Sequence, residues 1–354
     1  MPKNTASNHP QKIVSGLVSS LSDKQKDVIT KRFGLKDGQR RTLEAIGKEH
    51  GITRERVRQI EEDALNNLRK PQLISQINEF LGTLSRHIED HGSIKKEEYL
   101  LGKDIRAIFS EHKFIGHPKP TVHLILTLGD QFHKSHETKD WHSFWTTKKN
   151  IIPDVKSTIT TLHDKLKTHK QPVDKAVLID FTREIAKQKN LSDSDEALMS
   201  YIDISKNIDS NVFGQYGLAH WPEINPRGMK DKAYLVLKRL NKPLHFTQVA
   251  KEIEKAGLAK KLAHPQTVHN ELIKDNRFVL VGRGTYALTD WGFAPGTIKD
   301  VIVKHLTESK KPLSKEEIVS AVLNQRQVKE NTVLLNLQNK KTFKKTTEGK
   351  YILA

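Results

Sequence analysis

Residues 42–68 of this chain read TLEAIGKEHGITRERVRQIEEDALNNL and contain the start and stop signals of two short helices. Thr42 and Thr53 stand where N-caps are expected, because each precedes a segment whose apolar residues recur at helical spacing. Gly51 lies between the two segments, where a helix commonly ends in the left-handed conformation that glycine adopts easily. The stretch therefore predicts two helices joined by a tight turn, the arrangement of a helix-turn-helix.

The second of these helices is predicted to have one apolar and one charged face. Its apolar residues recur every three or four positions, at Val57, Ile60, Ala64 and Leu68. This stripe should pack inward. The outward face then carries Arg54, Glu55, Arg58, Gln59 and Glu62. Arginine can bind guanine through two acceptors, glutamate can accept from the cytosine amino group, and glutamine can pair with adenine. A solvated charged face is the alternative, but the capped helix pair favours insertion into the DNA major groove.

The N-terminal motifs resemble region four of bacterial primary sigma factors. They are Leu21-Ser22-Asp23-Lys24-Gln25, Arg32-Phe33-Gly34-Leu35, Thr42-Leu43-Glu44, Thr53 through Glu61, Ala64-Leu65 and Leu68-Arg69. The resemblance implies that the second helix recognises the upstream promoter hexamer, the minus-thirty-five element. It also implies that the domain docks on the flap of the RNA polymerase beta subunit.

Carried over by position, the resemblance implies that Arg54, Glu55 and Gln59 read bases, while Arg56 and Arg58 contact phosphates or neighbouring bases. The predicted DNA-binding set of this domain also includes the two cap residues, Thr42 and Thr53. One departure from the family pattern is Lys24-Gln25, which replaces the usual Arg-Glu. This departure weakens the inference about the flap contact more than the inference about DNA.

A complete sigma factor also needs an upstream domain whose aromatic residues melt the promoter. Roughly twenty residues precede the resemblance here, and they hold no such aromatic cluster. We therefore expect that this chain does not open a promoter by itself.

Two short signatures recur along the chain after residue 170. A G-x-Y motif appears at intervals of 70 and 65 residues, as Gly214-Gln215-Tyr216, Gly284-Thr285-Tyr286 and Gly349-Lys350-Tyr351. A proline between predicted helices precedes each motif, at intervals of 71 and 69 residues, in Gln171-Pro172-Val173, Lys242-Pro243-Leu244 and Lys311-Pro312-Leu313. The segments around each glycine predict a strand, a turn and a strand. Helix, proline turn, two helices and a hairpin is the order of a winged helix, so three tandem units are predicted.

A fourth, divergent copy is predicted to fill residues 71–151. Its signs are Leu81 through His91 as a first helix, Gly92-Ser93-Ile94 in place of the proline turn, Thr121-Val122-His123 echoing Thr267-Val268-His269, and Trp141 through Trp145 in place of the wing end. We expect the repeated tyrosines, and Trp221 and Trp291 five positions after two of them, to fill small cores rather than contact a ligand.

The unit from Asp231 through Trp291 resembles the HARE-HTH domain, a family that includes the amino-terminal domain of the RNA polymerase delta subunit. The resemblance rests on Asp231-Lys232-Ala233, Pro243-Leu244-His245-Phe246 and Gly284-Thr285-Tyr286-Ala287-Leu288. It implies a winged-helix fold and an association with transcription or chromatin proteins, but no defined DNA sequence. A DNA-facing surface would lie near the third helix and the wing tip, at Lys260, Lys261, His264, Gln266, His269, Asn270 and Arg283. The same helix could instead face a protein partner.

Composition agrees with a nucleic-acid partner. The 354 residues include 60 Lys and Arg against 42 Asp and Glu, a formal net charge of +18 that is spread over the whole length. No apolar run is long enough to span a bilayer and no signal peptide is recognisable, so we expect a cytoplasmic, nucleoid-associated protein without a membrane partner. The absence of cysteine excludes disulfides and thiolate metal sites.

The histidines and carboxylates do not predict an active site. His133, His136 and His142 are close in sequence, but they lie where the divergent copy should have its wing, so a solvated hairpin is predicted rather than a metal site. The sequence contains no Gly-rich phosphate loop, Ser elbow or H-E-x-x-H motif. We therefore expect no enzymatic activity, no metal and no cofactor.

These observations predict a mainly α fold in which a helix-turn-helix domain is followed by tandem winged helices. The predicted units are a sigma region-four-like domain at 12–71, winged-helix-like units at 72–150 and 151–225, a HARE-HTH-like winged helix at 226–294, and a C-terminal winged-helix-like unit at 295–354. The favoured function is a sequence-specific transcription regulator or sigma-like factor that binds double-stranded DNA and the RNA polymerase core. The alternatives are a delta-like polymerase adaptor with little sequence specificity and a targeting subunit of a restriction or defence system.

Overall fold

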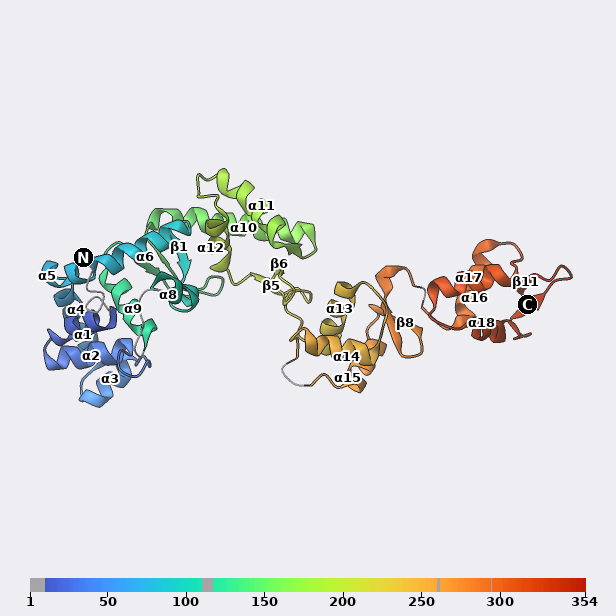
Figure 1. The fold of residues 1–354 in the computed structure, drawn as a ribbon, viewed down its shortest axis with the longest axis horizontal. Helices are drawn as coiled ribbons and strands as arrows, with labels where there is room; N and C mark the ends of the chain where they lie inside the picture. Colours follow the sequence, from blue (N-terminus) through green and yellow to red (C-terminus); the bar gives the residue numbers. More distant parts are fainter. Residues whose placement is uncertain (1–9, 110–116, 260–261, 294) are drawn as a thin grey trace, which may run out of the picture. The chain divides into compact units, whose positions relative to one another are not determined.

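The computed structural model describes residues 10–109, 117–259, 262–293 and 295–354, and the described chain is mainly helical, with several small sheets (Figure 1). The chain divides into two compact units, one ending at Asp209 and the other beginning at Ser210. Lys260 and Lys261 of the predicted DNA-binding set lie outside the described residues. No helix in the described ranges is long and apolar enough to cross a membrane.

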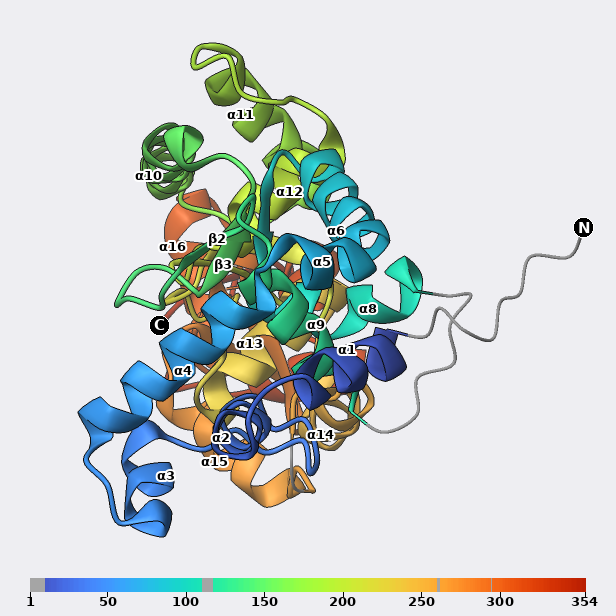
Figure 2. The same cartoon turned by 90° about the vertical axis from the view of Figure 1, so that its left-hand side faces the viewer.

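Unit 1 begins with α1 (Pro10–Ser19), α2 (Asp23–Phe33), α3 (Leu43–His50) and α4 (Arg54–Leu68). The predicted helix signals are confirmed, because Thr42 and Thr53 are the N-caps of α3 and α4 and Gly51 ends α3 with φ 63°. The small core of the helix-turn-helix consists of Val28, Ile46, Val57 and Ile60. Figure 2 shows α3 and α4 meeting at this turn.

The next segment wraps a three-stranded antiparallel sheet with helices. Its elements are α5 (Pro71–Ile74), η1 (Ser75–Ile77), α6 (Asn78–Asp90), β1 (Ile94–Lys96), α7 (Glu97–Leu100), α8 (Lys103–Ile108), α9 (Pro118–Leu128), β2 (His133–Ser135) and β3 (Phe144–Thr146). The strand order is β1-β3-β2, with Lys95 and Lys134 both opposite Trp145. Gly92 and Ser93, with φ 72° and 63°, form the turn into β1 that the sequence predicted in place of a proline turn.

One apolar core joins the helix-turn-helix to this second segment. Ile29 and Phe33 of α2 and Ala64 and Leu68 of α4 belong to the same buried cluster as residues of α6, α9 and β3. α2 and α4 therefore each have two buried faces, one inside the helix-turn-helix and one against the neighbouring segment, and α9 contacts both α1 and α2. The predicted boundary near residue 71 falls inside this continuous core.

A buried carboxylate fixes the sheet to its helices. Glu97 is the first residue of α7, and its carboxylate accepts hydrogen bonds from Ser143 Oγ at 2.8 Å and from Trp145 Nε1 at 3.2 Å, and pairs with Lys134 Nζ. Burial alone would raise the pKa of Glu97, but hydrogen bonds from His123, Lys134 and Ser143 hold it far below the usual range. These contacts link α7, β2, β3 and α9.

The last part of unit 1 contains η2 (Lys149–Ile151), α10 (Ile152–His169), β4 (Val173–Asp174), α11 (Lys175–Lys187), α12 (Asp195–Asp203) and the first residues of β5 (Ile208–Ser210). α12 packs on β1, because Ser200 Oγ donates to the carbonyl of Ile94 and Tyr201 Oη donates to that of Gly92 at 3.3 Å. The predicted unit at 151–225 therefore shares a packed boundary with the unit before it.

Unit 2 contains two further modules after β6 (Gln215–Leu218). The first consists of α13 (Met229–Leu240), β7 (Leu244–His245), α14 (Phe246–Lys255), α15 (Pro265–Lys274), β8 (Phe278–Gly282), β9 (Thr285–Leu288) and η3 (Thr289–Trp291), with strand order β7-β9-β8. The second consists of α16 (Ile298–Ser309), α17 (Lys315–Gln325), α18 (Glu330–Leu337), β10 (Phe343–Lys345) and β11 (Tyr351–Leu353). Each module has its own apolar core.

The repeated glycines and prolines have clear structural roles. Gly214, Gly284 and Gly349 all adopt a positive φ, and each precedes the returning strand of a hairpin, which is why glycine recurs there. Each repeated proline follows a helix that ends in a left-handed residue, at Lys170, Asn241 and Lys310. After the proline in the middle module the chain forms β7, a short third strand that sequence reasoning did not predict because its two residues are too few to show a period.

The expectation that the repeated aromatic residues fill cores holds unevenly. Tyr286 is 3% exposed and belongs to the core of its module. Tyr216, Tyr351, Trp221 and Trp291 are only half-buried, although Trp291 and Tyr351 pack against the cores of their modules.

Candidate nucleic-acid interface

The predicted reading residues lie together on the exposed face of α4. Arg54, Glu55, Arg58 and Gln59 are exposed, while Val57 and Ile60 on the opposite face are buried. This arrangement follows from the helical period, which brings residues three and four positions apart onto one side. The cap residues act on the backbone, because Thr53 Oγ1 accepts from the amide of Arg56 at 3.2 Å. Thr42 Oγ1 accepts from the amide of Ala45 at 3.1 Å in the same way.

Most of the outward polar groups on α4 are paired with one another. Arg58 donates from Nη2 to Glu55 Oε1 at 2.7 Å and from Nη1 to Glu62 Oε2 at 3.0 Å. Arg56 Nη1 donates to Gln59 Oε1 at 3.0 Å. The hydrogen bond from Arg58 lowers the pKa of Glu55, and the same contact raises the pKa of Arg58. These pairs are exposed, so each contributes little stability and can be exchanged for contacts to bases.

Arg54 differs from its neighbours. Within the described part of the chain its guanidinium makes no hydrogen bond or ion pair, and it lies in the first turn of α4. The N-terminal turn of a recognition helix is the part that approaches base edges in helix-turn-helix proteins. Arg54 is therefore available to a ligand without the loss of an internal contact.

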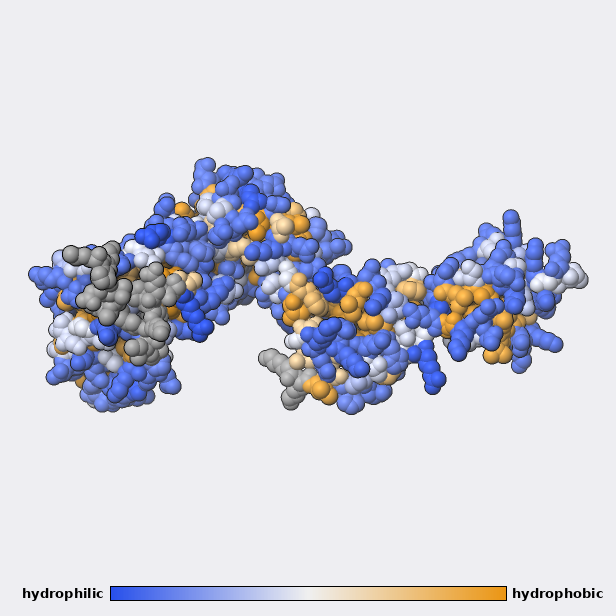
Figure 3. All heavy atoms as spheres, in the orientation of Figure 1, coloured by the Kyte–Doolittle hydropathy of each residue, from blue (hydrophilic) through white to orange (hydrophobic). Residues whose placement is uncertain are grey.

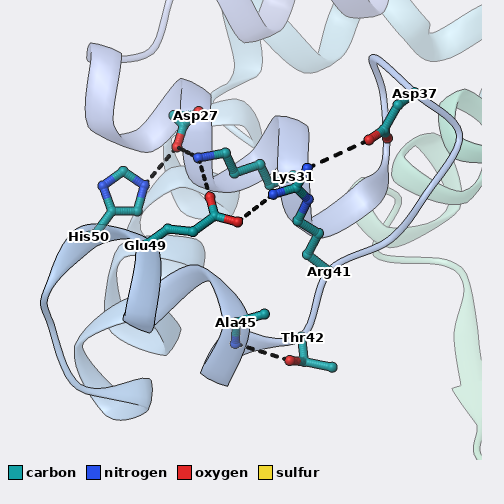
Figure 4. Close-up of polar contacts among 8 residues, drawn as sticks. All are labelled: Asp27, Lys31, Asp37, Arg41, Thr42, Ala45, Glu49 and His50. Atoms are coloured by element: carbon teal, nitrogen blue, oxygen red, sulfur yellow. Dashed lines mark hydrogen bonds and ion pairs between the residues drawn. The ribbon is translucent and has the colours of Figure 1, made fainter.

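A network of ion pairs holds α3 against α2 (Figure 4). Lys31 Nζ lies 2.8 Å from Asp27 and 2.7 Å from Glu49, Glu49 also pairs with Arg41, and His50 Nε2 lies 2.7 Å from Asp27. Burial would raise the pKa of Asp27, but the hydrogen bonds from Lys31 and His50 lower it. The hydrogen bond from Lys31 is the main cause that lowers the pKa of Glu49.

A second ion pair fixes α4 itself. Arg32 Nε of α2 donates to Glu61 Oε1 at 3.1 Å, and Arg32 Nη1 donates to the carbonyl of Arg41 at 3.2 Å. The side chain of Glu61 is 16% exposed, so this pair is better shielded from solvent than the pairs on the outward face. Sequence reasoning assigned no role to either residue, because ion pairs between residues 29 positions apart leave no local signal.

The second predicted DNA-binding set lies in the middle module. Gln266 and Asn270 are exposed on α15 and contact each other at 3.4 Å, and Arg283 is exposed in the turn between β8 and β9. His269 is half-buried instead, with its ring centroid 4.6 Å from that of Phe246 and its Nδ1 3.4 Å from Tyr286 Oη. His269 thus packs α15 against the hairpin, and His264 is the exposed residue before α15.

Comparison with known proteins locates two families in the chain. Residues 17–70 match sigma-70, region 4, and residues 227–291 match the HARE-HTH family, a helix-turn-helix domain named after ASXL and restriction endonuclease proteins among others. RNA polymerase sigma factor SigA of Listeria monocytogenes and that of Listeria innocua are each 48% identical to this chain over 65 residues. These residues make up 18% of this chain and 17% of either relative, so the similarity is confined to one domain.

Both matched families are DNA-binding helix-turn-helix types rather than enzyme families. The first match contains α2, α3 and α4 with their caps, and the second contains the three helices and the hairpin of the middle module. The chain therefore carries a sigma-70 region 4 domain, a sigma-like DNA-binding helix-turn-helix, near its N-terminus and a HARE-HTH domain over residues 227–291.

Proposed function

We propose that this protein is a sequence-specific transcription regulator whose helix α4 reads a promoter element similar to the minus-thirty-five hexamer. The main observation is that Arg54, Glu55 and Gln59 share one exposed face of a helix whose other faces are fixed in two cores. Fixing the helix lowers the conformational entropy lost on binding. The similarity to sigma factors over this domain supports the same role.

Recognition of bases by α4 requires that some of its side chains exchange intramolecular hydrogen bonds for contacts with DNA. Arg54 can donate two hydrogen bonds to a guanine without breaking an internal contact. Glu55 and Gln59 must first release Arg58 and Arg56, after which the released arginines can bind phosphates. Because the released pairs are exposed, the exchange costs little free energy.

The modules of unit 2 are expected to add an electrostatic contribution to the free energy of DNA binding. The net charge of +18 and the exposed Arg283 in the HARE-HTH turn favour phosphate contacts beyond those of α4. These contacts would raise the affinity for any DNA, whereas α4 would supply the preference for one sequence.

A polymerase adaptor with little sequence specificity is the second candidate function. It is favoured by the exposed apolar side chains of the HARE-HTH domain, where Leu262, Ile273 and Leu280 are 80%, 62% and 48% exposed. In Figure 3, hydrophobic residues gather on the surfaces of both modules of unit 2. Apolar side chains at the surface favour a protein partner over phosphate. By contrast, the buried apolar residues of α1, α2 and α4 already pack within unit 1, which limits the surface that this domain offers to a polymerase flap.

Selection of bound sequences from random duplex DNA at near-physiological salt would separate the two functions. We expect the wild type to enrich one motif, and Arg54→Ala to relax a single base position of it. Lys24→Ala is the control, because Lys24 is exposed on α2 and lies outside the predicted DNA-binding set. If neither the wild type nor the control enriches a motif, while the protein co-purifies with RNA polymerase, the adaptor is the correct function.

A further inference from the structure

A cavity of about 300 Å³ lies where the sigma-like domain meets the segment that follows it. Arg32, Phe33, Arg40 and Glu61 line it from one side, and residues of α9, β2 and β3 and of the loops that flank β2 line it from the other. We propose that this cavity is a binding site for a small organic anion, a carboxylate on a planar apolar body. This site lies apart from the DNA-reading face, and the proposal does not depend on what α4 reads.

The floor of the cavity is aromatic and apolar. Phe33, Phe132 and Trp145 line it and are 3%, 6% and 3% exposed, and the ring of His123 lies 5.4 Å from that of Phe33 and 5.9 Å from that of Trp145. Such rings offer flat surfaces against which a planar group can pack. A volume of 300 Å³ is at the small end of ligand pockets, so the cavity fits a small molecule rather than a nucleotide.

The rim of the cavity is cationic. Arg32, Arg40 and Lys134 line it together with His136, and among the described lining residues the only carboxylate is that of Glu61. Arg32 already pairs with Glu61, and Lys134 pairs with Glu97 just behind the wall. The guanidinium of Arg40 has no hydrogen bond or ion pair within the described ranges, so it is the group that an anion would neutralise.

The environment of Arg40 supports this assignment. Although the residue as a whole is exposed, partial burial lowers the pKa of its guanidinium and the positive charge of Arg32 lowers it further, while the negative charges of Glu97 and Glu61 act in the opposite direction. A carboxylate bound between these two arginines would relieve their repulsion and accept the paired donors that a guanidinium presents. The apolar floor favours a planar apolar group, and the two arginines at the rim favour an anion that can pair with a guanidinium through two oxygens.

His123 contributes a buried ring, not an exposed cation, to the floor of the cavity. His123 is 6% exposed, and its Nε2 lies 3.5 Å from Oε1 of Glu97, a longer contact than those that Ser143 and Trp145 make with the same carboxylate. Burial lowers the pKa of His123, which disfavours the charged form of its ring. The groups that line the cavity and can pair with the ligand's carboxylate are Arg40 and Arg32.

Titration calorimetry of the full chain with benzoate, acetate and benzamide tests the proposal. Benzoate carries both features, acetate lacks the ring, and benzamide lacks the charge. We expect benzoate to bind with the highest affinity, and Arg40→Gln to weaken benzoate binding about tenfold or more, because a charge-assisted pair is lost. Lys36→Gln removes a charge from the same loop at a residue that does not line the cavity, and it should bind benzoate as the wild type does.

Three results would overturn the proposal: benzoate fails to bind, benzamide binds as tightly as benzoate, or Arg40→Gln and Lys36→Gln weaken benzoate binding equally. If benzoate does not bind, DNA-binding measurements on Arg40→Gln would show whether the charge of Arg40 contacts DNA instead. A salt dependence whose slope is reduced by about 1 would identify Arg40 as a phosphate contact. Both variants change exposed side chains, and unchanged thermal unfolding without ligand would show that they remain folded.

Discussion

At the scale of single residues, charge is used in two different ways in unit 1. On the outward face of α4 the ion pairs are exposed and exchangeable, as between Arg58 and Glu55, whose side chains are 51% and 61% exposed. Inside the unit the Glu97 carboxylate is 15% exposed and accepts several hydrogen bonds. Exposed pairs contribute little to stability, whereas breaking a shielded pair leaves a charge that solvent cannot reach.

Arg54→Ala should weaken binding to the selected DNA site by about 1–3 kcal/mol and relax one base position. The reason is that Arg54 has no internal partner among the described residues, so its loss should leave the folded state unchanged. Competition binding with each single-base variant of the site measures the effect. Equal affinity of Arg54→Ala and the wild type for every variant would show that Arg54 reads no base.

Glu97→Gln should destabilise unit 1 by about 3 kcal/mol at neutral pH, because Lys134 loses the carboxylate with which it pairs. The neighbouring change Glu98→Gln is the control, since Glu98 is 73% exposed in its pair with Lys96. Urea unfolding of both variants measures the difference. Equal stability of the two variants would show that the buried carboxylate contributes nothing.

Acid should destabilise the wild type more than Glu97→Gln. The pKa of Glu97 is lowered in the folded protein from an ordinary value of 4.5, so the unfolded chain binds the proton first. The stability that Glu97 contributes is fully present above 4.5 and is lost as the pH falls through that value toward the folded pKa. Urea unfolding at a series of decreasing pH values should therefore give a steeper decline for the wild type. Parallel declines would contradict this assignment.

At the scale of elements, glycines at equivalent positions of two repeated hairpins have different surroundings. Gly284 and Gly214 have φ of 67° and 78° and both precede a returning strand. A Cβ on Gly284 would lie 2.5 Å from His245 Nε2, whereas one on Gly214 would meet nothing within 4 Å. Backbone strain acts at both positions, but a steric clash acts only at the first.

Gly284→Ala should therefore destabilise unit 2 by roughly 2–4 kcal/mol, and Gly214→Ala by roughly 1–2 kcal/mol. In the first variant the methyl group must displace the His245 ring, which packs 4.4 Å from Phe246. Thermal unfolding followed by circular dichroism compares the two. A larger loss of stability in Gly214→Ala would show that backbone strain in the hairpin turn, and not the clash with His245, determines the destabilisation.

At the scale of the whole molecule, the sigma-like domain is stabilised by its neighbour. Ile29 and Phe33 of α2 share a core with Leu126 of α9, which lies more than 90 residues further along the chain. Burial of apolar area on both faces of α2 and α4 couples the folding of these segments. Beyond unit 1, the net charge of +18 acts over the entire chain and favours association with phosphate.

Leu126→Ala should increase hydrogen exchange at the amides of α2 and α4. The cavity that it creates lowers stability by about 2–5 kcal/mol, and this loss is shared by the elements that pack into the same core. Leu306→Ala is the matched control, since Leu306 is buried in the separate core of the C-terminal module. Hydrogen exchange measured by mass spectrometry compares the two variants. Unchanged protection of α2 in Leu126→Ala would show that the helix-turn-helix folds independently.

Local features of this protein could be predicted from its amino-acid sequence. The caps Thr42 and Thr53, the turn at Gly51 and the buried stripe of α4 follow from residue type and period, and the structure confirms all of them. The glycine and proline repeats likewise located hairpins and helix ends. Such signals can be recognised in the sequence because backbone conformation depends on residue type and on neighbours within a few positions.

The contacts between these local features depend on the tertiary fold and could not be predicted. The ion pair of Arg32 with Glu61, the Glu97 cluster and the cavity beside Arg40 join residues from distant parts of the sequence. The fold also places His269 against Phe246 and Tyr286 rather than facing outward. Long-range contacts leave no periodic trace in the sequence, because packing selects partners by shape and charge after the chain has folded back on itself.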